Sequence, residues 1–198
     1  MMIGDAVEAL TITLLKITGV HITGMTDEVQ LNVAGAVING TDDIEIENKV
    51  FDIKTCSKWA FDNKWSKGYE HLKDNDDFGY VGQLIGYAKA KGKDPGGWIV
   101  ICKSTGRVKV VLCDVTPEEQ DRVKKKIAAT VKAINSKTQF KRCFEPEDDL
   151  WRGKPTGDKK LCKTCEFCSY LGTCWPNAEY KAYPKSEAKN PPRNWYVS

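Results

Sequence analysis

Apolar residues recur at helical spacing over the first 17 residues. Steps of three and four separate five of them, and this stripe predicts a helix packed on a core. The five residues are Ile3, Val7, Leu10, Leu14 and Ile17. Glu8 lies on the edge of the stripe, one turn before Ile12 and Leu15, so its carboxylate should point to the boundary of the core.

Strand patterns follow this helix. Apolar and polar residues alternate from Val29 to Val37, and apolar positions continue to Lys54, which predicts a β-meander with a turn at Asn48-Lys49. The segment between Lys54 and Tyr80, which contains Trp59, Phe61 and Trp65, is expected to be rich in loops. Residues 80–90 then match a helix, and the glycines of 92–97 should end it.

A hairpin and a long helix are predicted next. The β-rich runs 98–102 and 108–115 flank Ser104-Thr105-Gly106, which is typical of a hairpin turn. Thr116 is a good N-cap, Pro117 suits the first helical position, and the helix should continue to Asn135. The order helix, strands, helix, hairpin, helix predicts an α/β fold with a central mixed sheet flanked by helices.

The pattern changes beyond residue 135. The stretch 137–177 is rich in Lys, Cys, Gly and Trp and has no long periodic element, so something other than a hydrophobic core should hold it. We therefore predict three parts: a core over 1–140, a cysteine-rich segment over 141–178 packed on that core, and a tail over 179–198. The prolines of the tail favour an irregular path over the surface.

Composition limits the class of protein. A chain of 198 residues with 41% hydrophobic residues can form one domain with a small appendage, and a net charge of +3 neither requires nor excludes a polyanionic partner. No apolar run is long enough to cross a membrane, and the first residues do not resemble a secretory signal. We expect a cytoplasmic protein. Five of the eight cysteines lie in the last third of the chain, which favours metal binding over disulfides in a reducing compartment.

Two aspartates and a lysine form the most informative polar group. Asp52 and Lys54 are two residues apart on one predicted strand and so share a face, and Asp43 ends the strand before it. Carboxylates next to an ammonium suit metal-assisted phosphodiester hydrolysis, because they supply oxygen ligands for Mg²⁺ and a cation that orients water. A salt-bridged hairpin would give the same pattern.

An ordered series of motifs resembles the RecB-like branch of the PD-(D/E)XK nuclease superfamily. The series runs from Gly40-Thr41-Asp42-Asp43 through Phe51-Asp52-Ile53-Lys54 to Gln83-Leu84-Ile85-Gly86-Tyr87. The resemblance implies a restriction-endonuclease-like core over 1–140, with Asp43 and Asp52 as metal ligands and Lys54 as the catalytic lysine. It places Gln83 and Tyr87 on a helix near the active centre. Asp42 is an alternative to Asp43, although the spacing from Gly40 favours Asp43.

The resemblance also extends to the first helix and to a function. Glu8, in Gly4-Asp5-Ala6-Val7-Glu8, matches the acidic form of the family's first motif and would complete the metal site. Asp52 departs from the commoner Glu by one methylene. The implied protein is a phage-encoded, Mg²⁺- or Mn²⁺-dependent DNA exonuclease of recombination, repair or degradation, acting on DNA with single-stranded ends. A recombination or replication protein could be its partner.

The C-terminal cysteines predict a metal centre. Cys165, Cys168 and Cys174 have the spacing C-x2-C-x5-C, and a closed site needs a fourth ligand. Local spacing favours Cys162 and a zinc knuckle with four cysteines. The resemblance to RecB-like nucleases with iron–sulfur clusters instead implies Cys143, giving a [4Fe–4S] cluster on Cys143, Cys165, Cys168 and Cys174. Cys162 would then be a spare.

Two rival functions remain open from the sequence. The first is a non-catalytic DNA-binding or assembly subunit that keeps the nuclease fold, although such a protein has no need of Asp43, Asp52 and Lys54. The second is a structural protein stabilised by zinc. Trp59, Phe61 and Trp65 alternate with lysines after the predicted catalytic strand, which suits either stacking on a single DNA strand or a core.

Overall fold

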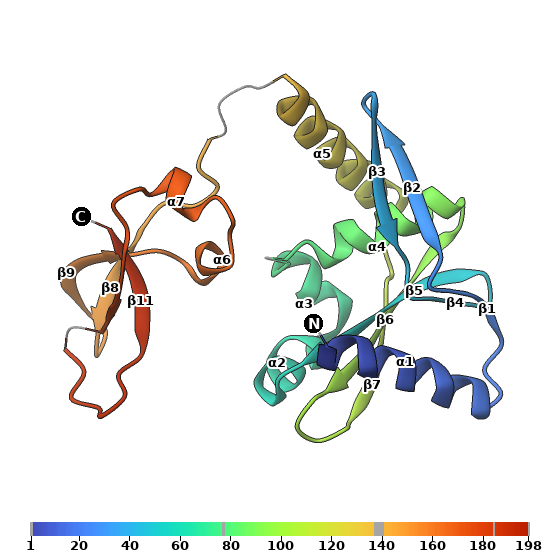
Figure 1. Cartoon of the computed structure of the whole chain (residues 1–198), viewed down its shortest axis with the longest axis horizontal. Helices are drawn as coiled ribbons and strands as arrows, with labels where there is room; N and C mark the ends of the chain where they lie inside the picture. The colour runs from blue at the N-terminus through green and yellow to red at the C-terminus, as the bar shows by residue number, and fades with distance from the viewer. Residues whose placement is uncertain (1, 77, 137–140, 184, 198) are drawn as a thin grey trace. The chain divides into compact units, whose positions relative to one another are not determined.

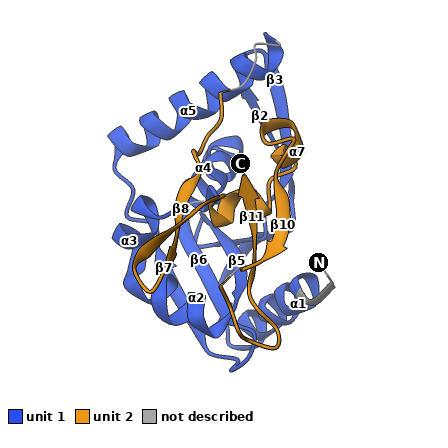
Figure 2. Cartoon of the chain, turned by 90° about the vertical axis from the view of Figure 1, so that its left-hand side faces the viewer, with its two compact units in different colours: residues 1–138 blue, residues 139–198 orange. Residues whose placement is uncertain are grey.

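The structure, a computed structural model, describes residues 2–76, 78–136, 141–183 and 185–197. The chain divides into two compact units, residues 1–138 and 139–198 (Figure 2). The predicted boundary after residue 140 falls in 137–140, outside the described residues. Among the described residues, no helix is both long and apolar enough to cross a membrane.

The first unit contains the predicted α/β core (Figure 1). Its helices are α1 (Met2–Ile17), α2 (Lys58–Asn63), α3 (Gly68–Asp74), α4 (Tyr80–Lys91) and α5 (Pro117–Asn135), with a 3₁₀ turn, η1, at Trp65–Lys67. Its strands are β1 (Ile22–Met25), β2 (Glu28–Val33), β3 (Ala36–Thr41), β4 (Ile44–Ile46), β5 (Lys49–Cys56), β6 (Asp94–Cys102) and β7 (Val108–Leu112). The order β1-β4-β5-β6-β7 forms a mixed sheet, in which β5 and β6 are parallel and the other pairs antiparallel.

The segment predicted to form one β-meander forms two separate hairpins, β2–β3 and β4–β5. β2 and β3 pair only with each other and form a separate two-stranded sheet, whereas β4 and β5 belong to the central sheet. The β4–β5 turn is centred on Glu47 and Asn48, one residue earlier than predicted, and both have positive φ angles of 50° and 65°. Such angles suit the type I′ turn, whose twist matches that of a hairpin.

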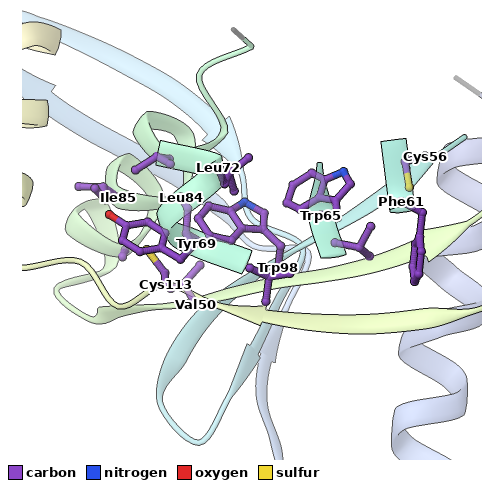
Figure 3. Packing of buried hydrophobic residues seen from close by; sticks show 14 of the residues in the cluster. Val50, Cys56, Phe61, Trp65, Tyr69, Leu72, Leu84, Ile85, Trp98 and Cys113 are labelled. Atoms are coloured by element: carbon purple, nitrogen blue, oxygen red, sulfur yellow. The ribbon is translucent and has the colours of Figure 1, made fainter. Parts of the chain in front are cut away.

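One face of the sheet carries the larger core (Figure 3). The indole of Trp98 on β6 is fully buried and lies against Trp65 and Tyr69, with ring centroids 6.0 and 6.4 Å away. These aromatics come from the segment expected to be rich in loops, which forms α2, η1 and α3. The spacing of Phe61, Trp65, Tyr69 and Leu72 by four, four and three residues is helical, and all four are buried. Phe61, Trp65 and Tyr69 therefore build the core, whereas Trp59 is 73% exposed.

The other face is covered by α1, but of the predicted stripe only Val7 is shown to pack on it. Ile12 is buried against the isoleucines of the sheet, and Val7 and Leu15 pack beside it. Leu10 and Ile17 are 57% and 76% exposed, and Leu14 is exposed with them. The prediction was wrong for Leu10, Leu14 and Ile17, because apolar residues cover more than half of the circumference of α1 and periodicity alone cannot choose the buried side.

The second unit has a sheet that the sequence analysis did not predict. It contains β8 (Glu147–Trp151), β9 (Lys154–Lys160), α6 (Lys163–Glu166), α7 (Leu171–Cys174), β10 (Glu179–Ala182) and β11 (Arg193–Val197). The four strands pair in the order β10-β11-β9-β8. Leu161, Tyr183 and Tyr196 are buried in this unit, so it does have apolar packing.

The prediction of an irregular tail over 179–198 was wrong, because this segment contributes β10 and β11 to the sheet. β10 and β11 are antiparallel neighbours, and β11 also pairs with β9. Pro191 and Pro192 precede β11, where they do not interrupt the ladder. Strands of four and five residues are too short for a convincing alternation, which is why the pattern predicted an irregular path.

We expect Gly97→Ala to destabilise the first unit strongly. Gly97 has φ 148°, and an added Cβ would lie 2.1 Å from the carbonyl oxygen of Val111, so β6 and β7 would have to separate. Urea unfolding should show a loss of at least about 2 kcal/mol. Gly4→Ala is the matched control: its Cβ meets no atom within 4 Å, and α1 should become more stable by up to about 1 kcal/mol. Equal effects of the two changes would contradict the close approach at Gly97.

Candidate active site

Asp43 lies between β3 and β4, with its carboxylate directed at the next strand. Its Oδ2 accepts a hydrogen bond from the backbone N–H of Ile53, at 2.6 Å. Burial raises the pKa of Asp43, and the Ile53 N–H and Lys54 partly offset that rise. The β3–β4 connection therefore brings one carboxylate to the middle of β5.

Asp52 and Lys54 share a face of β5, as the two-residue spacing predicts. Lys54 Nζ donates to Asp52 Oδ1 at 2.8 Å, and only 2% of Asp52 is exposed. Asp52 pairs in register with Trp98, which explains how little water reaches it. The second oxygen, Oδ2, is buried and has no hydrogen-bond partner among the described residues.

The pKa of Asp52 is raised from its ordinary value of 3.8 to about 6. Burial is the main cause, and repulsion from Asp43 and Glu8 adds to it against the attraction of Lys54. Partial burial of Glu8 on α1 raises its pKa, and repulsion from the Asp43 carboxylate adds to the rise. Three carboxylates thus oppose one another's ionisation, with Lys54 as the nearby cation.

Helix α4 supplies the amide and phenol of the group. Gln83 Oε1 accepts from Lys54 Nζ at 3.1 Å, and Gln83 Nε2 donates to the Tyr87 hydroxyl at 3.0 Å. Residues four apart share one helix face, so Gln83 and Tyr87 point the same way. The structure therefore brings together all six residues that the sequence analysis selected in this region. They are Glu8, Asp43, Asp52, Lys54, Gln83 and Tyr87.

Asp42, the alternative to Asp43, lies elsewhere. It is fully buried, accepts from the backbone N–H of Asp27 at 3.0 Å, and pairs with Lys91 Nζ at 3.0 Å. Successive side chains in an extended segment point to opposite sides, which separates Asp42 from Asp43. The geometry thus groups Asp43, not Asp42, with Asp52.

A second acidic cluster was not anticipated from the sequence. Carboxylate oxygens of Asp27, Asp42 and Glu45 all lie within 4.8 Å of one another, which is close enough to hold a metal ion. However, Lys91 Nζ pairs with all three residues, and Lys93 also pairs with Glu45. Burial lowers the pKa of Lys91, but the hydrogen bonds that its ammonium donates to the three carboxylates outweigh this effect and raise the pKa overall. This cluster already contains its cations, and no sequence spacing would have revealed it.

The C-terminal cysteines gather only in part. The sulfurs of Cys162 and Cys165 lie 3.7 Å apart. Burial is the main cause that raises the pKa of Cys165 to about 12, and interactions with Cys162, Cys168 and Cys174 add to the rise. Among the described residues, no three cysteine sulfurs lie within 4.8 Å of one another. Cys143 is exposed. Three of these thiolates are therefore not placed to hold a single metal ion such as zinc.

Cys143 nevertheless approaches the same segment through its neighbour. The guanidinium of Arg142 lies 3.8 Å from the ring centroid of Trp175, the residue after Cys174. This cation–π contact joins the two ends of the segment within the second unit. The contact therefore brings the residue before Cys143 to the residue after Cys174.

Comparison with known proteins adds little. No protein-family model matches the chain, and no curated protein matches it. A solved structure of a protein named SSO0001 is similar over 66% of this chain, with 19% sequence identity and a TM-score of 0.42. The matched part is 59% of that protein's length. This similarity assigns neither a family nor an activity.

We expect the buried carboxylate of Asp52 to make stability depend on pH. Since the folded protein holds this proton up to a pH of about 6, while the unfolded chain releases it near 3.8, ionisation of Asp52 opposes folding as the pH rises. Relative to the wild type, Asp52→Asn should gain up to roughly 3 kcal/mol between pH 4 and 7, measured by urea unfolding in EDTA. A stability difference that does not change with pH would contradict this assignment.

Proposed function

We propose that the chain is a metal-dependent DNA exonuclease with a restriction-endonuclease-like core. The observation that carries this proposal is the pairing of Lys54 with the buried Asp52. Asp43 is bonded to the neighbouring residue Ile53, and Glu8 lies near enough to interact electrostatically with both aspartates. A buried salt bridge needs one carboxylate for one ammonium, whereas this group has two further carboxylates, which raise the pKa of Asp52. Such an arrangement is unfavourable unless a cation binds, because like charges in a poorly solvated site repel strongly.

The chemistry of Glu8, Asp43 and Asp52 suits a divalent metal ion, but their carboxylate oxygens do not all lie within 4.8 Å of one another in this structure, so the three side chains would have to move together to bind one. Asp52 Oδ2 is a buried oxygen without a partner, and Asp43 and Glu8 offer the further oxygen ligands that Mg²⁺ and Mn²⁺ prefer. Asp27, Asp42 and Glu45 fit less well, because Lys91 lies among them. A metal ion bound by Glu8, Asp43 and Asp52 would supply a Lewis acid for the phosphoryl oxygen.

Lys54 has the central role among the chain's own groups. Its ammonium is held by Asp52 Oδ1 and Gln83 Oε1, so two of its three protons are directed and one remains for water or a phosphate oxygen. A fixed cation at this point offsets the negative charge that develops on the phosphoryl group. Gln83 positions Lys54, and Tyr87 in turn fixes the amide of Gln83.

The second unit belongs to the same proposal as a [4Fe–4S] segment on Cys143, Cys165, Cys168 and Cys174, with Cys162 as the competing ligand. Four thiolates in a unit with a small core suit a site that stabilises the fold when it is loaded. Zinc is the alternative occupant. The proposed setting is a phage-encoded cytoplasmic enzyme of DNA recombination, repair or degradation, with DNA that has single-stranded ends as its substrate.

We predict that Lys54→Ala abolishes DNA cleavage while leaving the fold intact. Loss of the oriented ammonium should lower the rate by at least about 100-fold, because it removes charge stabilisation in the transition state. The measurement is cleavage of end-labelled single- and double-stranded DNA in Mg²⁺, Mn²⁺ or EDTA. Lys49→Ala, an exposed lysine on the same strand, is the control and should cleave normally. DNA binding without cleavage by the wild type in either metal would favour the non-catalytic subunit instead.

We predict that Cys143→Ala removes iron from anaerobically purified protein, whereas Cys162→Ala leaves it. The metal-free second unit should also be digested faster by protease, since cluster binding contributes to its folding. Iron and sulfide analysis with absorption near ~400 nm measures the outcome. Iron retained in Cys143→Ala but lost in Cys162→Ala would assign the local set of four cysteines. A colourless protein with one zinc would exclude the cluster, because Zn²⁺ is d¹⁰.

A further inference from the structure

A pocket of about 380 Å³ lies beside the candidate active site, between the β2–β3 hairpin, α4 and α5. Its volume lies within the roughly 300–1,000 Å³ that small-molecule sites occupy. Gln83 and Tyr87 line the pocket, and Gln83 also accepts the hydrogen bond from Lys54. The pocket and the carboxylate group therefore share a wall.

The walls are mostly apolar, with a few polar groups. Val29, Leu31 and Ile38 come from the hairpin, and Asn39, Gln83 and Tyr87 add two amides and a phenol. A planar, largely apolar ligand with polar edges would match this lining. A nucleobase has this chemistry, and an aromatic ring such as that of Tyr87 can stack on any of the four bases.

Two glycines of α4 form the helical side of the pocket. Glycine destabilises a helix interior relative to alanine, yet a Cβ at Gly82 or Gly86 would meet only ordinary contacts, the nearest at 4.0 and 3.9 Å. Gly40 is different, because its Cβ would lie 2.7 Å from the Tyr87 ring. Helix packing therefore requires glycine at neither position 82 nor position 86. The absence of side chains there keeps the pocket open, which would explain why glycine is present.

We infer that this pocket binds one unstacked nucleobase of the strand whose phosphodiester lies at Asp52 and Lys54. The inference rests on the proposed nuclease function and adds a binding site for one base of that DNA. A base is joined to its phosphate through a single sugar, so a pocket that shares Gln83 with the site is within reach of the adjoining nucleotide. A base can enter only after it leaves its stack, which costs least in single-stranded or frayed DNA. The pocket thus selects unpaired ends.

The test combines a protein variant whose side chain fills the pocket with a DNA substrate that lacks the base, and measures each change alone and both together. Gly86→Met extends a side chain into the pocket from a position where a Cβ fits. We expect this variant to cleave a single-stranded 20-nucleotide DNA about 10-fold more slowly or worse. The wild type should lose the same factor on DNA with abasic residues at both ends. The variant should lose nothing further on the abasic DNA, because both changes remove one interaction.

Two further variants keep this test decisive. Ala129→Met adds the same side chain on the exposed side of α5 and should cleave like the wild type. Gly86→Ala should raise the melting temperature and slow cleavage less than Gly86→Met, so a folding defect of the larger change would be recognised. Normal cleavage of intact DNA by Gly86→Met would overturn the base pocket and leave the nuclease standing. Absence of cleavage by the wild type with every DNA and metal would overturn the proposed function itself.

Discussion

The parallel pairing of β5 with β6 extends along all of β5, from Lys49 to Cys56, at the centre of the five-stranded sheet. Parallel neighbours cannot be joined by a tight turn, so the chain must cross one face of the sheet before it returns. Residues 57–93 make this crossing and contain α2, α3 and α4. Because α4 ends the crossing, Gln83 comes to lie over Lys54. The pairing that forms the core therefore also assembles the site.

Motifs that depend on local spacing were well predicted from the sequence. The face shared by Asp52 and Lys54 follows from the two-residue period, and that shared by Gln83 and Tyr87 follows from the helical one. The capping box that begins α5, with Thr116 and Glu119 bonded to each other's backbone, was likewise partly visible as an N-cap before Pro117. Each of these features needs only residues that are near in sequence.

Features that depend on distant partners were missed. The buried side of α1 is chosen by the isoleucines of β4, β5 and β6, which meet Ile12, and the helix sequence carries no record of them. The short strands of the second unit become strands through pairing, β8 and β11 with β9 and β10 with β11, not through their own alternation. Lys91 lies 64 residues from Asp27, a separation at which spacing gives no signal. Tertiary contacts decide in all three cases.

The ion-pair cluster around Lys91 affects how ionic strength acts on the molecule. Asp42 and Glu45 are almost completely buried, and salt screens buried charges far less than exposed ones. The cluster therefore holds the chain around Asp42, and with it the neighbouring Asp43, in high salt as well as low. Contacts to a DNA backbone weaken steeply as salt rises. Under the proposed function, added salt should therefore release DNA well before it disturbs the arrangement of the carboxylates.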